Sequence, residues 1–204
     1  MPIRPLVTEA REWTEEFVAE LYEVNRYLVF RNLPTETGAA GGRADADVVG
    51  FRRRADTLEI CDVEVGTYYD SARAIAADIA ARFNDARKDH VLKAIRTAVD
   101  PGGVLGSRYT PVFVDASWSD RQFPGLKSML RARGILGQSL EQLIDRAPVD
   151  IRRWQRQSAT PKGTEPQLPR SFKILRILEA AHWTWKWERG WDADLPEPAE
   201  PPFA

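Results

Sequence analysis

The nine residues from Leu58 to Gly66, LEICDVEVG, constrain the fold more than any other segment of the chain. Their β-branched and apolar composition predicts a β-strand. Strand residues two positions apart lie on the same face of a sheet, so Asp62 and Glu64 should point in the same direction. Close carboxylates oppose each other's ionisation unless a cation compensates them. The pair therefore indicates either a solvated strand face balanced by arginines of the FRRR segment at 51–54, or a metal site.

The other predicted elements are typical of an α/β core followed by helices. Apolar residues spaced by three or four predict an amphipathic helix over residues 8–25. The strand at 57–65 should pair with residues 46–53 in a hairpin. Further strands are predicted at 26–33 and 108–118, an alanine-rich helical stretch at 69–99 with a break near Asn84 or Asp89, short helices at 123–135, 139–147 and 149–157, and a longer helix at 170–190.

This order of elements divides the chain into three regions. Residues 1–118 form the α/β core, and residues 119–192 form a helical, basic region. The tail at 193–204 is rich in proline and glutamate, which predicts disorder.

The charges are segregated along the chain, although the net charge is only −1. Between Pro101 and Leu178, 13 lysines and arginines face 6 acidic residues, so this segment carries +7 and the remainder −8. Of the 29 basic residues 23 are arginines, which suits phosphate binding but also follows from a GC-rich genome. The segregation favours a polyanionic partner, although each cluster alone also fits a solvated helix face. The candidate nucleic-acid-binding clusters are Lys127, Arg131 and Arg133; Arg152, Arg153 and Arg156; and Arg170, Lys173 and Arg176.

Composition excludes several classes of protein. No apolar run approaches the roughly 18 residues of a membrane span, and the first residues lack an apolar signal core, so a cytoplasmic protein without a membrane partner is expected. Cys61 is the single cysteine, which excludes an internal disulfide and a cysteine-rich zinc site. His90 and His182 are far apart, which argues against a histidine metal site.

The expected hairpin brings a third carboxylate toward the acidic pair. A turn centred between Arg54 and Ala55 places Asp47 opposite Asp62, with Glu64 one pleat further along. Three carboxylates at one end of a sheet would suit Mg²⁺, which prefers hard oxygen ligands. Asp47, Asp62 and Glu64 are therefore the candidate metal ligands, for Mg²⁺ or Mn²⁺.

Two segments, ADADVVGF at 44–51 and LEICDVEV at 58–65, together resemble the core motif of the PD-(D/E)xK nuclease superfamily. The resemblance is to archaeal-type Holliday-junction resolvases and related restriction-like endonucleases, and it extends from Glu15 to Trp118. It implies a restriction-endonuclease-like core made of a helix, a mixed β-sheet with a central hairpin, a helix and a strand. Asp47 matches the first acid of the motif and Asp62 the second.

This sequence departs from the motif where the family has its lysine, because that position is Glu64. The resemblance implies that Glu64 acts as a general base or an additional metal ligand, or that the basic role has moved to a helix residue such as Arg73 or Lys88. The glutamate that such resolvases carry on their first helix corresponds to Glu15, with Glu16 and Glu20 as alternatives in register. The implied catalytic residues are Asp47, Asp62, Glu64 and Glu15.

The resemblance implies an Mg²⁺-dependent endonuclease that hydrolyses phosphodiester bonds of DNA in restriction, repair, recombination or phage defence. The missing lysine keeps a second hypothesis open, namely a catalytically inactive nuclease-fold subunit that binds nucleic acid or takes part in an assembly. A third is an unrelated α/β protein whose carboxylates are structural. A homodimer or a subunit of a protein complex is compatible with the first two.

Overall fold

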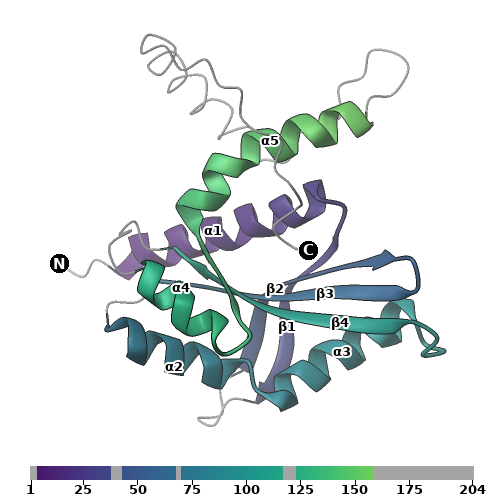
Figure 1. The fold of residues 1–204 in the computed structure, drawn as a ribbon, viewed down its shortest axis with the longest axis horizontal. Coiled ribbons are helices and arrows are strands. Elements are labelled where there is room, and N and C mark those ends of the chain that lie inside the picture. The colour runs from purple at the N-terminus through teal and green to yellow at the C-terminus, as the bar shows by residue number, and fades with distance from the viewer. Residues whose placement is uncertain (1–3, 38–42, 68–69, 117–122, 159–204) are drawn as a thin grey trace.

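The structure is a computed structural model that describes residues 4–37, 43–67, 70–116 and 123–158 (Figure 1). Within these residues the chain adopts an α/β fold with one five-stranded sheet, as the sequence predicts. The strands are β1 (Leu28–Thr37), β2 (Arg43–Arg54), β3 (Thr57–Gly66), β4 (Gly106–Asp115) and β5 (Leu136–Ser139). The helices are α1 (Arg4–Val24), α2 (Ala72–Arg82), α3 (Asp85–Val99), α4 (Phe123–Arg131) and α5 (Leu140–Ser158).

The sheet is mixed, and its spatial order is β1-β2-β3-β4-β5. The first three strands are antiparallel, whereas β3, β4 and β5 are parallel. Parallel neighbours need crossover connections, which α2 and α3 provide between β3 and β4, and α4 provides between β4 and β5. The hairpin predicted from residues 46–53 and 57–65 is confirmed as β2 and β3.

Helices cover both faces of the sheet (Figure 1). Phe17 and Leu21 of α1 pack with Val63 of β3 and with buried residues of α5 on one face. On the other face, Ile60 of β3 packs with Ile95 of α3, while α2 and α4 cover the neighbouring part of the sheet. Successive residues of β3 therefore face different helices, and its side chains from Leu58 to Val65 are all buried.

Helix α1 lies very close to the sheet at Gly50 of β2. A Cβ atom at this position would lie 2.5 Å from Cδ1 of Tyr22, a distance that ordinary packing does not allow. Tyr22 also contacts the ring of Tyr27 edge to face, with 5.1 Å between the ring centroids. The glycine thus allows a large aromatic side chain of α1 to lie directly on the strand.

Three helical segments show where the sequence prediction holds and where it fails. The predicted break in 69–99 is confirmed, because α2 ends at Arg82 and α3 begins at Asp85, with the Asn84 side chain as N-cap. The two helices predicted at 139–147 and 149–157 are wrong, since α5 is continuous and includes Pro148. One side of α5 is buried together with residues of α1; it consists of Leu143, Ala147 and Ile151. This burial offsets the cost of an internal proline, about 3 kcal/mol.

Several predicted features lie outside the described residues. They are the helix at 170–190, the tail at 193–204 and the basic residues Arg170, Lys173 and Arg176. Conversely, the strand β5 is not predicted from the sequence. It adds to the sheet residues from the region after 118, which is expected to be helical. In the part of the chain that the structure describes, no helix has the length and apolar character needed to cross a membrane.

Candidate functional site

The acidic pair of β3 lies in the interior of the protein. Asp62 has no solvent-exposed surface, and Glu64 is only 4% exposed. Ile60, on the same side of the strand, packs with Val91 of α3. Because side chains alternate along a strand, Asp62 and Glu64 face the α2–α3 side of the sheet. A solvated strand face, one of the two explanations considered for the pair, is therefore wrong.

The hairpin register differs by two residues from the expected one. Asp62 pairs with Val49, so the expectation that Asp47 faces Asp62 is wrong. The turn consists of Ala55 and Asp56, between the paired residues Arg54 and Thr57, and it is therefore centred one residue later than expected.

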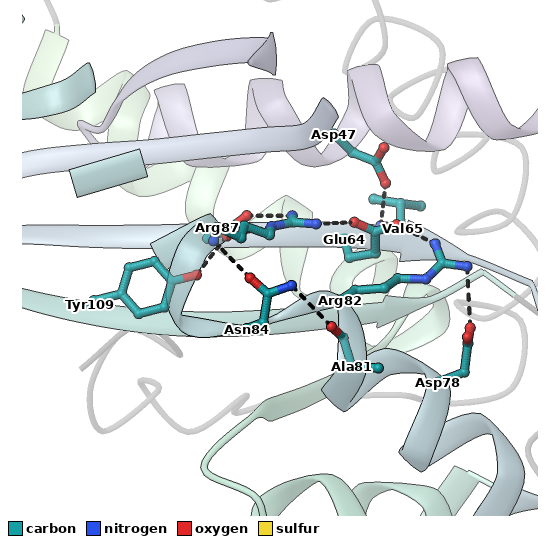
Figure 2. A network of polar contacts seen from close by, with 10 residues as sticks. Asp47, Glu64, Val65, Asp78, Ala81, Arg82, Asn84, Arg87 and Tyr109 are labelled. Carbon is teal, nitrogen blue, oxygen red and sulfur yellow. Dashed lines mark hydrogen bonds and ion pairs between the residues drawn. The ribbon is translucent and has the colours of Figure 1, made fainter. Parts of the chain in front are cut away.

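Asp47 lies beyond the last paired residues of β2 and β3. Its carboxylate oxygen Oδ2 accepts a hydrogen bond of 2.8 Å from the backbone N–H of Val65 (Figure 2). The side chain thereby satisfies a backbone donor at the point where the β2–β3 pairing ends. Asp47 is 5% exposed, so all three expected metal ligands are buried.

Arg87, in the first turn of α3, joins the two carboxylates of β3 (Figure 2). Its Nε and Nη2 donate to Asp62 Oδ2 and Oδ1 over 2.8 and 2.6 Å, and its Nη1 donates to Glu64 Oε2 over 2.9 Å. The Asn84 cap holds this turn in place, because Asn84 Oδ1 accepts from the Arg87 backbone N–H at 2.8 Å. A planar guanidinium matches carboxylates in this fork geometry, and its positive charge compensates the pair as a metal ion would.

Arg82 and Tyr109 complete this group of side chains. Arg82 Nη1 donates to Glu64 Oε1 over 2.6 Å, and its Nη2 donates to Asp78 Oδ2 over 3.2 Å. The Tyr109 hydroxyl donates to Asp62 Oδ2 over 2.6 Å. We call Asp62, Glu64, Arg82, Arg87 and Tyr109 the arginine–carboxylate network; it connects β3 to β4, α2 and α3.

The pKa values of the network's donors agree with this arrangement. Burial by itself lowers the pKa of Arg87, but the hydrogen bonds and charges of Asp62 and Glu64 outweigh burial and raise it above its ordinary value. Burial, together with the charge of Asp62, raises the pKa of Tyr109 as well. Both groups therefore stay protonated and remain hydrogen-bond donors at neutral pH.

The carboxylates of β3 do not fit a metal site in this arrangement. Each of the four oxygens of Asp62 and Glu64 accepts a hydrogen bond from an arginine. Arg82 and Arg87 balance the two negative charges. Among the residues that the structure describes, no three or more acidic, histidine or cysteine side chains form a group that could hold a metal ion.

The glutamate expected from α1 does not lie beside the carboxylates of β3. Glu15 is half-buried on α1, whose buried residues pack against the opposite face of the sheet from Asp62. Of its two alternatives, Glu16 forms an ion pair of 3.0 Å with Arg31, and Glu20 is buried. The structure thus brings Asp62 and Glu64 together, places Asp47 at the end of their hairpin and leaves Glu15 on the other face.

Arg87 is not among the site residues predicted from the sequence. Arg73 and Lys88, the helix residues named for the absent lysine, are exposed, and Lys88 Nζ lies 6.0 Å from the ring centroid of Tyr109. Arg87 is buried and shares the inner face of α3 with Val91 and Ile95. A sequence signal did exist, because positions 87, 91 and 95 are spaced by four and an arginine there must face the sheet.

The expected nucleic-acid-binding residues are described only in part. Lys127, Arg131 and Arg133 are exposed on α4 and the turn after it. Arg153 of α5 is half-buried and lies 3.5 Å from Asp150. Arg152 and Arg156 belong to α5, but their side chains lie outside the described part of the structure.

Comparison with known proteins adds no relative: no protein-family model matches the chain, and no curated protein matches it with significance.

Proposed function

We propose that the chain is a catalytically inactive nucleic-acid-binding protein with a restriction-endonuclease-like core. The order α1, β1, the β2–β3 hairpin, two helices and the parallel strand β4 supports this core. The excess of seven positive charges between Pro101 and Leu178 supports a polyanionic partner. In this proposal Asp62 and Glu64 anchor helices to the sheet and do not bind a catalytic ion.

One observation supports the proposal that the protein is catalytically inactive, namely that Arg87 contacts both Asp62 and Glu64. The Arg87 side chain is only 8% exposed, and Asp62 is fully enclosed. A hydrated Mg²⁺ ion keeps several water ligands and must reach a phosphate group. Both needs conflict with a carboxylate that has no exposed surface and whose two oxygens already contact a guanidinium.

An Mg²⁺-dependent or Mn²⁺-dependent DNA endonuclease is the second candidate, and the position of Arg82 favours it. Arg82 is 42% exposed and joins Glu64 to Asp78, so this cation lies at the rim of the network. A bound metal ion would polarise the scissile phosphate and neutralise developing charge. The candidate requires Arg82 and Arg87 to release the carboxylates first, and the present arrangement supports no further step.

Plasmid cleavage and duplex binding, measured on the same preparation, separate the two candidates. We expect the wild-type protein to bind DNA in a salt-dependent manner and to leave supercoiled plasmid intact in Mg²⁺ or Mn²⁺. Asp47→Asn and Glu64→Gln variants serve as controls for a contaminating nuclease. Cleavage by the wild type that both substitutions abolish would establish the endonuclease, and failure to bind DNA would remove the nucleic-acid function altogether.

A further inference from the structure

The segment that contains α4 and the turn leading to β5 contributes only positive charges to the surface. Between Phe123 and Gln138 the sequence contains three basic residues and no aspartate or glutamate. All three basic side chains are exposed. We call Lys127, Arg131 and Arg133 the α4 cluster.

Packing of α4 fixes the side of the helix that the cluster occupies. Leu126 and Leu130 are buried with Ile79 of α2 and Phe113 of β4. Lys127 and Arg131 are four residues apart, so they lie on the same side of the helix, separated by about 6 Å along its axis. Arg133 Nη1 donates to the backbone oxygen of Met129 over 3.0 Å, which holds this residue over the last turn of α4.

Small exposed residues lie around the cluster. A Cβ atom at Gly125 would meet no atom within 4 Å. The other small exposed residues of this surface are Ser128, Ala132 and Gly134. These small side chains let a polyanion approach the helix closely. Over the roughly 6 Å between Lys127 and Arg131, one strand of a duplex presents about two phosphates.

The composition of this surface argues against other polyanionic partners. An anionic membrane would need an apolar helix face to enter the interface, but the apolar face of α4 is buried. An acidic protein would need an apolar interface core, and among the exposed residues from 123 to 138 the only large hydrophobic side chain is Met129. Single-stranded nucleic acid is held by stacking on aromatic rings, whereas Phe123, the aromatic residue of this segment, is 5% exposed.

We infer that the α4 cluster binds the phosphate backbone of double-stranded DNA without reading its sequence. This inference rests on the proposed nucleic-acid function and specifies its substrate class and its contact residues. Each cation contacts phosphate oxygens, and no side chain of this surface stacks on a base. Binding then depends on salt and on the duplex form, but not on base order.

Fluorescence anisotropy with four ligands tests the inference. The full-length protein is titrated with a labelled 24-base-pair duplex, a duplex of shuffled sequence, one of the single strands, and vesicles of anionic phospholipid. The decisive variant is Lys127→Ala/Arg131→Ala/Arg133→Ala. The matched control, Arg53→Ala/Lys93→Ala/Arg108→Ala, removes the same charge from exposed positions on β2, α3 and β4. Circular dichroism and thermal unfolding check that both variants are folded.

We expect both duplexes to bind equally well and more tightly than the single strand. Loss of the cluster should lower duplex affinity at least tenfold and reduce the salt slope by about 2.7, or 0.9 for each lost phosphate contact. The control should keep the wild-type slope. Equal losses in both triple variants, tighter binding of the single strand, or binding of vesicles in place of DNA would overturn this inference while the wild type still binds a polyanion. Failure of the wild type to bind any nucleic acid would overturn the proposed function and this inference together.

Discussion

Replacing Arg87 by methionine should destabilise the protein strongly, because it leaves two buried carboxylates short of a cation. Asp62 would lose both of its guanidinium hydrogen bonds, and Glu64 would keep only Arg82. Breaking a buried ion pair by removing one partner costs about 3–5 kcal/mol. For a chain of this size, that loss lowers the melting temperature by roughly 6–20 °C.

Arg82→Met provides the matched control, since it also removes one positive charge and one hydrogen bond to Glu64, which Arg87 contacts as well. Arg82 is 42% exposed, and Glu64 retains Arg87, so the expected loss after solvent screening is below about 1 kcal/mol. Urea and thermal unfolding of the two variants give the comparison directly. Equal losses for the two substitutions would refute the view that burial of Arg87 makes its ion pairs essential.

A second substitution distinguishes the lost charge balance from lost packing. In Arg87→Met/Asp62→Leu both members of the buried pair become apolar, whereas Glu64 keeps Arg82. Such paired replacements are often neutral, so the double variant should recover at least about 1 kcal/mol relative to Arg87→Met alone. A double variant less stable than Arg87→Met would show that the cost comes from packing.

Three further predictions concern the core. Gly50→Ala should lower the free energy of unfolding by about 1–3 kcal/mol, because the new Cβ meets Tyr22 at 2.5 Å. Gly102→Ala, where the atom nearest to the new Cβ is 3.6 Å away, should lower it much less. Urea unfolding measures both losses. Tyr109→Phe removes a hydroxyl that donates to a buried carboxylate, and it should lower the free energy of unfolding by about 1.5–3 kcal/mol in the same assay. A loss below about 0.5 kcal/mol, as for a substitution at an exposed position, would contradict this. Burial raises the pKa of the Cys61 thiol from 9.0 to about 11, so the folded state binds the proton more tightly and stability should fall as the pH rises from about 9 to 11. Cys61→Ala should show a shallower decline over this range, and parallel curves would refute the assignment.

The hairpin and the parallel strand could be predicted from the sequence because their signals are local. β-branched runs on either side of a polar turn identify β2 and β3, and a continuous apolar run identifies β4. The register could not be obtained in the same way. A two-residue turn at Ala55–Asp56 and a turn centred one residue earlier leave the same side chains on each face, so the hydrophobic pattern does not distinguish them.

The partner of the acidic pair was missed because it is distant in sequence and carried by another element. The alternation in β3 correctly places Asp62 and Glu64 on one face, but it does not identify the cation opposite them. Arg87 lies 25 residues after Asp62 and meets it only because the Asn84 cap starts a new helix at that point. The continuity of α5 through Pro148 and the four-residue strand β5 likewise depend on tertiary packing that the local sequence does not encode.

A crystal structure of the protein grown with Mn²⁺ in excess, with anomalous data, tests the central claim most directly. The account predicts that Arg87 Nη2 stays about 2.6 Å from Asp62 Oδ1 and that no anomalous peak lies at the carboxylates of Asp62 and Glu64. An anomalous peak that places a manganese ion on both carboxylates, with Arg87 displaced from them, would contradict the account.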